Sequence, residues 1–215
     1  MKKNLFEFEE LSWFLNSEDY KIGYPGFLSK DQVSAHCVHH QNYETALKEE
    51  VKNNWNNDFS NLPKIMYKLR HKTSCATQFW YHNVFWNNLT NKQGSPGPVT
   101  LKHILESYHS LENLKDSFIS TGLNHFSNGW YVLGFHKGYP VSLKCLTFKD
   151  GIAPMTMNFY PILVMDLWEH SYYLDYKWNK KEYLQAAWNK INWEVVEDRL
   201  VNSEKYMQSM EGFWS

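Results

Sequence analysis

The chain has 215 residues, a length that allows one large domain or two small ones sharing an interface. Its aromatic content is high, at 17%, which indicates a globular protein because disordered chains are poor in aromatic residues. The net charge of −1, with Arg70 and Arg199 as the only arginines, argues against direct binding to nucleic acid. The longest apolar run, Tyr160 to Met165, is too short for membrane insertion, and the N-terminus lacks the apolar core of a secretory signal.

The first half of the chain is expected to be a helical hairpin. Residues 1–28 show no clear period, but Ser29 and Gln32 form a capping-box pattern that opens a helix reaching about Lys52. After a polar loop, Pro63 is a favourable first residue for a second long helix that ends before Gly94.

The stretch 92–98, KQGSPGP, is the clearest linker in the chain. It divides the sequence into an N-terminal extension, a hairpin domain and a C-terminal α/β domain, with predicted bounds of 1–22, 23–93 and 94–215.

The second half alternates helices with apolar strands. Two helices are expected at about 100–109 and 111–126, and further helices begin near Trp168, Lys181 and Glu194. Between them lie three strands, which predict an α+β fold with helices packed on a three-stranded antiparallel sheet: Gly129 to Phe135, Val141 to Phe148 and Tyr160 to Asp166.

The three cysteines, Cys37, Cys75 and Cys145, are widely spaced and form no CxxC pair. They predict free thiols in a reducing compartment, the cytoplasm or the mitochondrial matrix, better than a disulfide framework or a thiolate zinc site.

Metal-ligand residue types gather in three places, and imidazole with carboxylate suits a first-row metal such as iron, manganese or zinc. On one helix, residues at i, i+3, i+4 and i+7 share a face, and a second helix carries a pair at i, i+4. The third group stands where a buried strand ends. The candidates are His36, His39, His40 and Tyr43, then Gln78 and His82, then Asp166 and His170.

Each candidate also has a plain structural interpretation. A single helical His is usually a surface or core residue, His39-His40 could be a solvated pair, and Asp166 could cap the following helix. The tryptophans after Asp166 could be core or interface aromatics. Five histidines have no helpful companion and are taken as non-functional: His71, His103, His109, His125 and His136.

Together these segments resemble the iron/manganese superoxide dismutases. The similarity is densest in DLWEHSYYLDYKWNKKEYLQAAWNKINW (166–193), where the family has D-x-W-E-H-A-Y-Y, and it continues in FSNGWYVL (126–133) and QFWYHNVFWNNL (78–89). It is weaker in LSKDQVSAHCVHHQNYETAL (28–47) and does not extend to residues 1–22.

The resemblance implies one iron per chain, with manganese as the other metal, held by His36, His82, Asp166 and His170. Iron is favoured because iron-type members carry a Gln at the position of Gln78, whereas most manganese members bring a Gln from the sheet. It further implies a gateway pair, a charge that attracts superoxide, an aromatic shell and residues that cross a homodimer interface. The gateway pair is His39 and Tyr43, and the attracting charge is that of Lys180. The aromatic shell is formed by Trp80, Trp86, Trp130 and Trp168, and the interface residues are Glu169 and Tyr173.

The first helix departs from the family pattern. The family spaces its ligand and His-His pair as H-x-x-x-H-H, but here the segment from His36 to His40 is one residue shorter. One alignment places Ala35 at the ligand position and another places His36 there; His36 is preferred. Tyr81 also replaces the usual Asn before His82, and Lys180 replaces the usual Arg.

The predicted function is therefore an antioxidant enzyme that converts superoxide to O2 and H2O2. The alternative is a dismutase-like structural subunit docked into a larger mitochondrial assembly, such as a ribosome or respiratory complex, with reduced or no activity. A third interpretation is an unrelated helical zinc protein.

Overall fold

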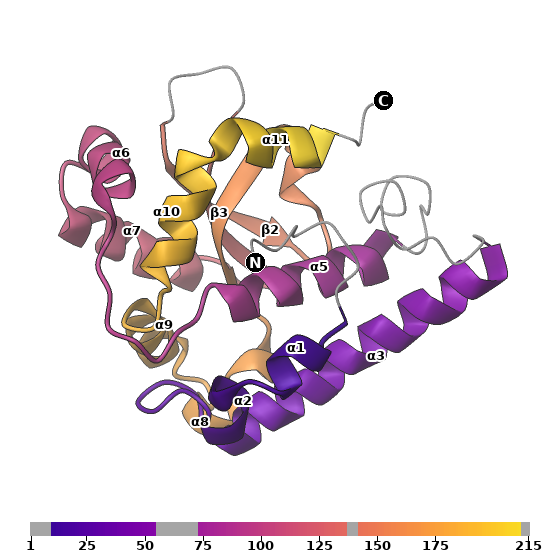
Figure 1. The fold of residues 1–215 in the computed structure, drawn as a ribbon. Helices are drawn as coiled ribbons and strands as arrows, with labels where there is room; N and C mark the ends of the chain where they lie inside the picture. Colours follow the sequence, from indigo (N-terminus) through magenta and orange to yellow (C-terminus); the bar gives the residue numbers. More distant parts are fainter. Residues whose placement is uncertain (1–9, 55–72, 137–141, 212–215) are drawn as a thin grey trace.

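The computed structural model describes residues 10–54, 73–136 and 142–211 (Figure 1). The fold is α+β: helices come first, and a second group of helices packs on a three-stranded antiparallel sheet, as predicted. No helix in these ranges is long and apolar enough to cross a lipid bilayer.

Two short helices precede the hairpin, α1 (Ser12–Leu15) and α2 (Glu18–Ile22), and the sequence pattern did not reveal them. The Ser17 hydroxyl oxygen caps α2 by accepting from the Tyr20 N–H at 3.1 Å. The ring of Phe14 in α1 stacks on that of Trp86, with 4.5 Å between centroids. This N-terminal segment therefore shares the core with the helices that follow it.

The long helices α3 (Lys30–Asn54) and α5 (Thr73–Asn87) pack against each other (Figure 1). Ser29 caps α3, since its Oγ accepts from the Gln32 N–H at 3.1 Å. The other half of the predicted capping box is wrong: the Ser29 N–H donates to Asp175 at 2.6 Å, and Gln32 turns its side chain elsewhere. The predicted start of the second helix at Pro63 lies outside the described residues.

The sheet has the order β2-β1-β3, formed by β1 (Gly129–His136), β2 (Lys144–Lys149) and β3 (Phe159–Asp166), with the 3-10 turn η1 (Pro154–Met157) before β3. Both neighbouring pairs are antiparallel, and Trp130 pairs with Asp166 across β1 and β3. Because cross-strand partners share a face, Trp130 stands beside the carboxylate at the end of β3.

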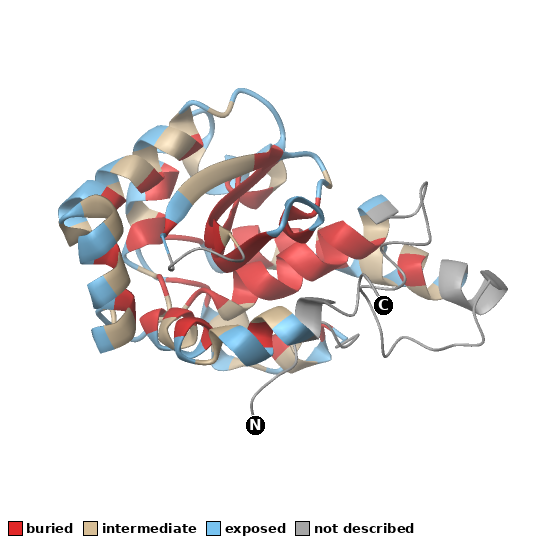
Figure 2. Cartoon of the chain, turned by 90° about the horizontal axis from the view of Figure 1, so that it is seen from above, coloured by how far each residue is buried: buried red, intermediate tan, exposed pale blue. Residues whose placement is uncertain are grey.

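The core lies where α5 packs against β3 and β1. Residues 76–86 of α5 and every residue of β3 are buried, as the continuous red segments in Figure 2 show. A helix buried on all sides places its polar side chains in the interior, where they must find partners. His82 and Gln78 are such residues.

The other face of the sheet is covered by α7 (Leu111–Leu123), whose Phe118 contacts the Tyr131 ring at 4.7 Å. Before it, α6 (Pro98–Tyr108) packs on α10 (Trp193–Val201). Glu197 of α10 accepts from the first free N–H groups of α6, at 3.0 Å from Val99 and 2.7 Å from Thr100. A helix end that lacks its own capping side chain is thus capped by another helix.

The helix expected from Trp168 is not continuous, and that prediction is wrong. The chain instead forms a 3-10 turn, η2 (Glu169–Ser171), and a single-turn helix, α8 (Tyr173–Tyr176). Tyr172 between them has φ −142, outside the helical range. Helices then resume with α9 (Lys180–Trp188), α10 and α11 (Ser203–Glu211).

Candidate metal centre

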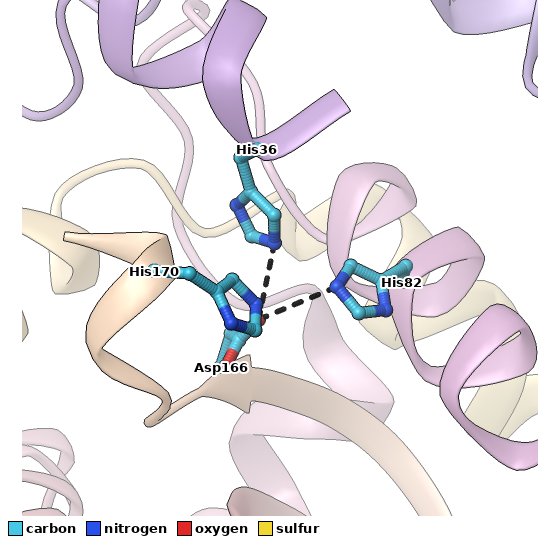
Figure 3. Close-up of side chains that lie close together, drawn as sticks. All are labelled: His36, His82, Asp166 and His170. Carbon is cyan, nitrogen blue, oxygen red and sulfur yellow. Dashed lines mark hydrogen bonds and ion pairs between the residues drawn. The ribbon is translucent and has the colours of Figure 1, made fainter. Parts of the chain in front are cut away.

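Four side chains from four elements point toward one another in the interior (Figure 3). His36 comes from α3, His82 from α5, Asp166 from the end of β3 and His170 from η2. These are the four predicted ligands, and the fold brings all of them together from positions far apart in the sequence.

All three imidazoles direct Nε2 toward one carboxylate oxygen, Oδ2 of Asp166. The distances are 3.1 Å from His36, 3.7 Å from His82 and 3.2 Å from His170. One candidate ligand atom from each residue lies within 4.8 Å of every other. Three nitrogens and one oxygen around a common centre form the donor set of a first-row metal.

Backbone and hydroxyl groups hold these ligands in place. The Nδ1 of His82 lies 2.6 Å from the Gln78 carbonyl, which leaves its Nε2 facing the centre. Oδ1 of Asp166 accepts from the Trp168 N–H at 2.8 Å, and its backbone carbonyl accepts from the Tyr183 hydroxyl at 2.8 Å. Asp166 therefore caps the following turn with one oxygen and presents the other to the imidazoles.

Burial and charge prepare the site for a cation. Burial opposes ionisation of Asp166, but the charges and hydrogen bonds of His170 and His36 hold the pKa of this carboxyl well below its usual value. Burial lowers the pKa of both His36 and His82. Neutral imidazoles and an ionised carboxylate are the ligand forms a metal needs.

The residues present fit a metal ion. The Nε2 of His82 is buried and has no hydrogen-bond partner among the described residues. A buried imidazole nitrogen without a partner is costly, and a cation at the centre would use its lone pair.

The structure distinguishes Ala35 from His36, the two residues that the alignments place at the ligand position of the first long helix. His36 is buried and faces Asp166, while the side chain of Ala35 is exposed. On the same face, the His39 ring lies 4.0 Å from the His170 ring and 4.8 Å from the Tyr43 ring, between centroids. α3 is helical throughout these positions, so the shorter spacing requires no break in the helix.

The gateway candidates lie at the edge of the centre. Burial, with help from His170, lowers the pKa of His39 to about 4, so its imidazole is neutral at neutral pH. Burial, with help from the Asp166 charge, raises the pKa of Tyr43 to about 12, so its hydroxyl stays protonated. His40 is fully buried beside His82, at 5.1 Å between ring centroids.

Aromatic rings surround the ligands. Trp86 lies 4.8 Å from the His36 ring, Trp130 lies 5.0 Å from the His82 ring, and Trp168 lies 5.7 Å from the His170 ring, between centroids. Trp80 is fully buried and contacts the Tyr81 ring at 4.9 Å. An apolar shell of this kind lowers the local dielectric and limits the access of water to the centre.

The remaining predicted residues lie toward the surface. The Lys180 ammonium donates to the His125 carbonyl at 3.0 Å, and burial lowers its pKa against the opposing charges of Asp166 and Glu169. The side chains of Glu169 and Tyr173 are exposed beside the His170 turn.

Two residues beyond the predicted set take part in holding the site. The Tyr183 hydroxyl anchors Asp166, and its position as the last tyrosine of the 166–193 motif is a signal that could have found it. The Gln32 side chain binds the His170 turn, but its sequence context indicated only a cap.

Comparisons with known proteins agree with this geometry. A family model described as iron/manganese superoxide dismutases, C-terminal domain, matches residues 96–199. The chain is also 31% identical to superoxide dismutase [Fe] of Escherichia coli (strain K12) over 175 residues, which cover 80% of this chain and 90% of that protein. The chain belongs to the iron/manganese superoxide dismutase family.

Two other members of this superoxide dismutase family are similar to the chain over most of its length. Superoxide dismutase [Mn/Fe] of Rickettsia bellii is 29% identical over 184 residues, or 82% of this chain and 86% of that one. Superoxide dismutase [Fe] 2, chloroplastic, of Oryza sativa subsp. japonica is 27% identical over 200 residues, or 92% of this chain and 71% of that one. The similar proteins thus include iron and manganese/iron types.

Proposed function

We propose that this protein converts superoxide to O2 and H2O2 at a single iron or manganese ion held by His36, His82, Asp166 and His170. The observation that carries the proposal is the convergence of three imidazole Nε2 atoms on Oδ2 of one buried carboxylate, at 3.1–3.7 Å. Membership of the iron/manganese superoxide dismutase family supports the same reaction.

When bound, the metal ion supplies one-electron chemistry: one superoxide is oxidised to O2, and a second is reduced and takes two protons to give H2O2. The protein's own residues guide the substrate. The protonated Tyr43 hydroxyl can donate a hydrogen bond to an anion at the site, and the His39 ring beside it is neutral. The Lys180 cation adds an attractive field for superoxide.

Iron is the metal we favour. Gln78 stands one helical turn before His82, which is the position of the iron-type Gln, and its amide lies between Trp130 and the turn after β2. That turn, Lys149-Asp150-Gly151, offers no Gln that could play the manganese-type role.

A homodimer is part of the proposal, as the exposed Glu169 and Tyr173 suggest for residues that reach a partner. Two large aromatic side chains are also strongly exposed, Phe126 at 97% and Trp178 at 84%. The hydrogen bond from Lys180 to the His125 carbonyl brings these two segments together. An exposed aromatic surface of this kind is typical of an interface.

A structural subunit of a mitochondrial assembly remains the alternative, but no specific observation favours it. The relatives described above carry names of dismutases rather than of assembly subunits. We place the enzyme in a reducing compartment, cytoplasmic or mitochondrial, because all three cysteines are free thiols.

Metal analysis combined with a superoxide assay tests the proposal. The purified protein should carry about one iron or manganese per chain and remove superoxide, and His170→Ala should lose both properties. His109→Asn is the matched control, because His109 is an exposed residue at the end of α6 with φ 67, a conformation that Asn tolerates. Purified protein with neither metal, or an active His170→Ala variant, would refute the proposed site.

A further inference from the structure

The side chain of Gln32 is fully buried on α3, one turn before the candidate ligand His36. Residues four apart share a helix face, so both side chains point toward the same region. Burying a Gln costs conformational entropy and desolvation, and the cost is offset only where its amide finds partners.

Both ends of this amide bind the segment that carries His170. Its Nε2 donates to the His170 carbonyl at 2.8 Å, and its Oε1 accepts from the Leu174 N–H at 2.9 Å. Nearby, the Ser29 N–H donates to the Asp175 carboxylate at 2.6 Å. Three hydrogen bonds therefore connect the first turn of α3 to residues 170–175.

That segment has little regular structure of its own. η2 and α8 are single turns separated by the non-helical Tyr172, and the Leu174 N–H bonds to Gln32 rather than to a helix carbonyl. The His170 imidazole is also less buried than the other ligands, with 23% of its side chain exposed against 0% for His36, His82 and Asp166. Core packing fixes the other three ligands more firmly than it fixes His170.

We propose that Gln32 is a positioning residue that sets the place of His170 relative to His36. The proposal rests on the proposed function, in which both histidines hold the metal. α3 then contributes one ligand directly and holds a second through the Gln32 amide, so the distance between the two is fixed by a single helix. The role is distinct from the helix cap that the sequence pattern predicts for this residue.

Gln32→Met tests this role, because Met has a similar length but neither donates nor accepts in this way. Apo protein is titrated with Mn²⁺ and Fe²⁺, and the spectrum of the iron-loaded protein is recorded by electron paramagnetic resonance. We expect metal affinity about 10–100-fold weaker than in the unmodified protein, as is usual when a group that orients a ligand is lost. The ferric signal should also change shape, which a loss of stability alone does not cause.

Two controls separate positioning from general damage. Gln41→Met makes the same change at an exposed position of the same helix, and Ile104→Val weakens the core in the distant helix α6. Both should keep the affinity and the ferric signal of the unmodified protein. An unchanged Gln32→Met variant, or an equal loss in Ile104→Val, would overturn the proposal.

A second variant decides the matter if Gln32→Met does not fold. Gln32→Glu keeps the acceptor for the Leu174 N–H but turns an oxygen toward the His170 carbonyl, so metal affinity should again fall and an unchanged affinity contradicts the inference. In the unmodified protein the Leu174 amide should exchange its hydrogen slowly, and fast exchange there contradicts it too. Failure of the unmodified protein to bind either metal would instead refute the proposed function.

Discussion

The indole N–H of Trp130 donates to Oε1 of Gln78 at 3.1 Å, and Nε2 of the same amide donates to the Asp150 carbonyl at 3.2 Å. These two bonds fix which end of the amide faces the sheet and which faces the turn after β2. Tyr81 completes the arrangement, since its ring stacks on Trp130 at 4.6 Å and its hydroxyl donates to the Ile152 carbonyl at 2.7 Å. Tyr81, which stands where the family usually has Asn, thus supports the orientation of Gln78.

Replacement of Gln78 by Leu should lower superoxide turnover while the protein still binds metal. Leu is similar in volume but leaves the buried Trp130 N–H without an acceptor, a loss of about 1–3 kcal/mol in stability. The backbone carbonyl that orients His82 is kept in this variant, so the metal should still bind. Loss of the amide that holds Trp130 beside the His82 ring should lower activity about tenfold or more. Stopped-flow superoxide decay, normalised to metal content, measures the effect.

The control for this variant is Gln93→Leu, which changes an exposed residue of the linker. It should match the unmodified protein in turnover and in urea unfolding. Full activity in Gln78→Leu would show that the amide has no part in the reaction and would remove the argument for iron over manganese.

Gly129 is expected to tolerate no side chain. A Cβ there would lie 2.3 Å from the Phe148 carbonyl oxygen and 2.5 Å from His125 Nε2, so the strand would have to move. Its neighbour Trp130 pairs with Asp166, and the displacement would reach the carboxylate ligand. Gly129→Ala should therefore destabilise the protein by about 1–3 kcal/mol and reduce its metal content.

Urea unfolding and elemental analysis check both effects of the Gly129 change. Gly94→Ala serves as the comparison, because a Cβ at Gly94 would meet only Trp193 at an ordinary 3.9 Å. Equal stability of the two variants would show that β1 can shift at residue 129 without harm to the site.

Glu197 should stabilise the protein in a pH-dependent way through its cap on α6. Burial raises the pKa of this carboxyl, but hydrogen bonds from Thr100 and Val99 outweigh it and lower the pKa below its usual 4.5. A folded-state pKa below the unfolded value means that the stabilisation is present above 4.5 and is lost as the pH falls through the folded-state pKa. Glu197→Gln should cost about 1 kcal/mol at neutral pH, the usual value of a helix cap.

Urea unfolding at several pH values tests the Glu197 cap. The difference between the unmodified protein and Glu197→Gln should shrink as the pH drops below the ordinary glutamate value, since both then carry a neutral side chain. Glu49→Gln, a change at an exposed position of α3, should show no such trend. A constant difference at all pH values would mean that the charge of Glu197 does not contribute.

Much of the fold follows from local sequence patterns. β1 and β3 are largely apolar runs, whereas β2 follows an alternating pattern. The Ser29 cap and the end of the long helix near Lys52 agree with the sequence pattern to within a few residues. The four ligands were found because their spacing matches a family motif, not because any one of them is distinctive. Local patterns suffice where the element is long and its burial is regular.

The sequence failed where partners far along the chain decide the structure. The helix expected from Trp168 is interrupted where the backbone N–H of Leu174 bonds to Gln32, 142 residues away, instead of to a helix carbonyl. The short helices before residue 23 depend on the packing of Phe14 against Trp86, and no hydrophobic period in the local sequence predicts such a contact. The Gln32 side chain was misassigned for the same reason, since its partner is 138 residues away.

The exposed aromatic residues Phe126 and Trp178 should hold two copies of the chain together. Size-exclusion chromatography with light scattering should give about 51 kDa, twice the 25.7 kDa chain mass. Phe126→Asp should shift this toward the monomer, because a charge buried in an apolar interface is costly. Leu105→Asp, a change at a residue of α6 that is 47% exposed, should leave the mass unchanged. A monomer in the unmodified protein would contradict the dimer, and a very large particle from native extract would favour the structural subunit.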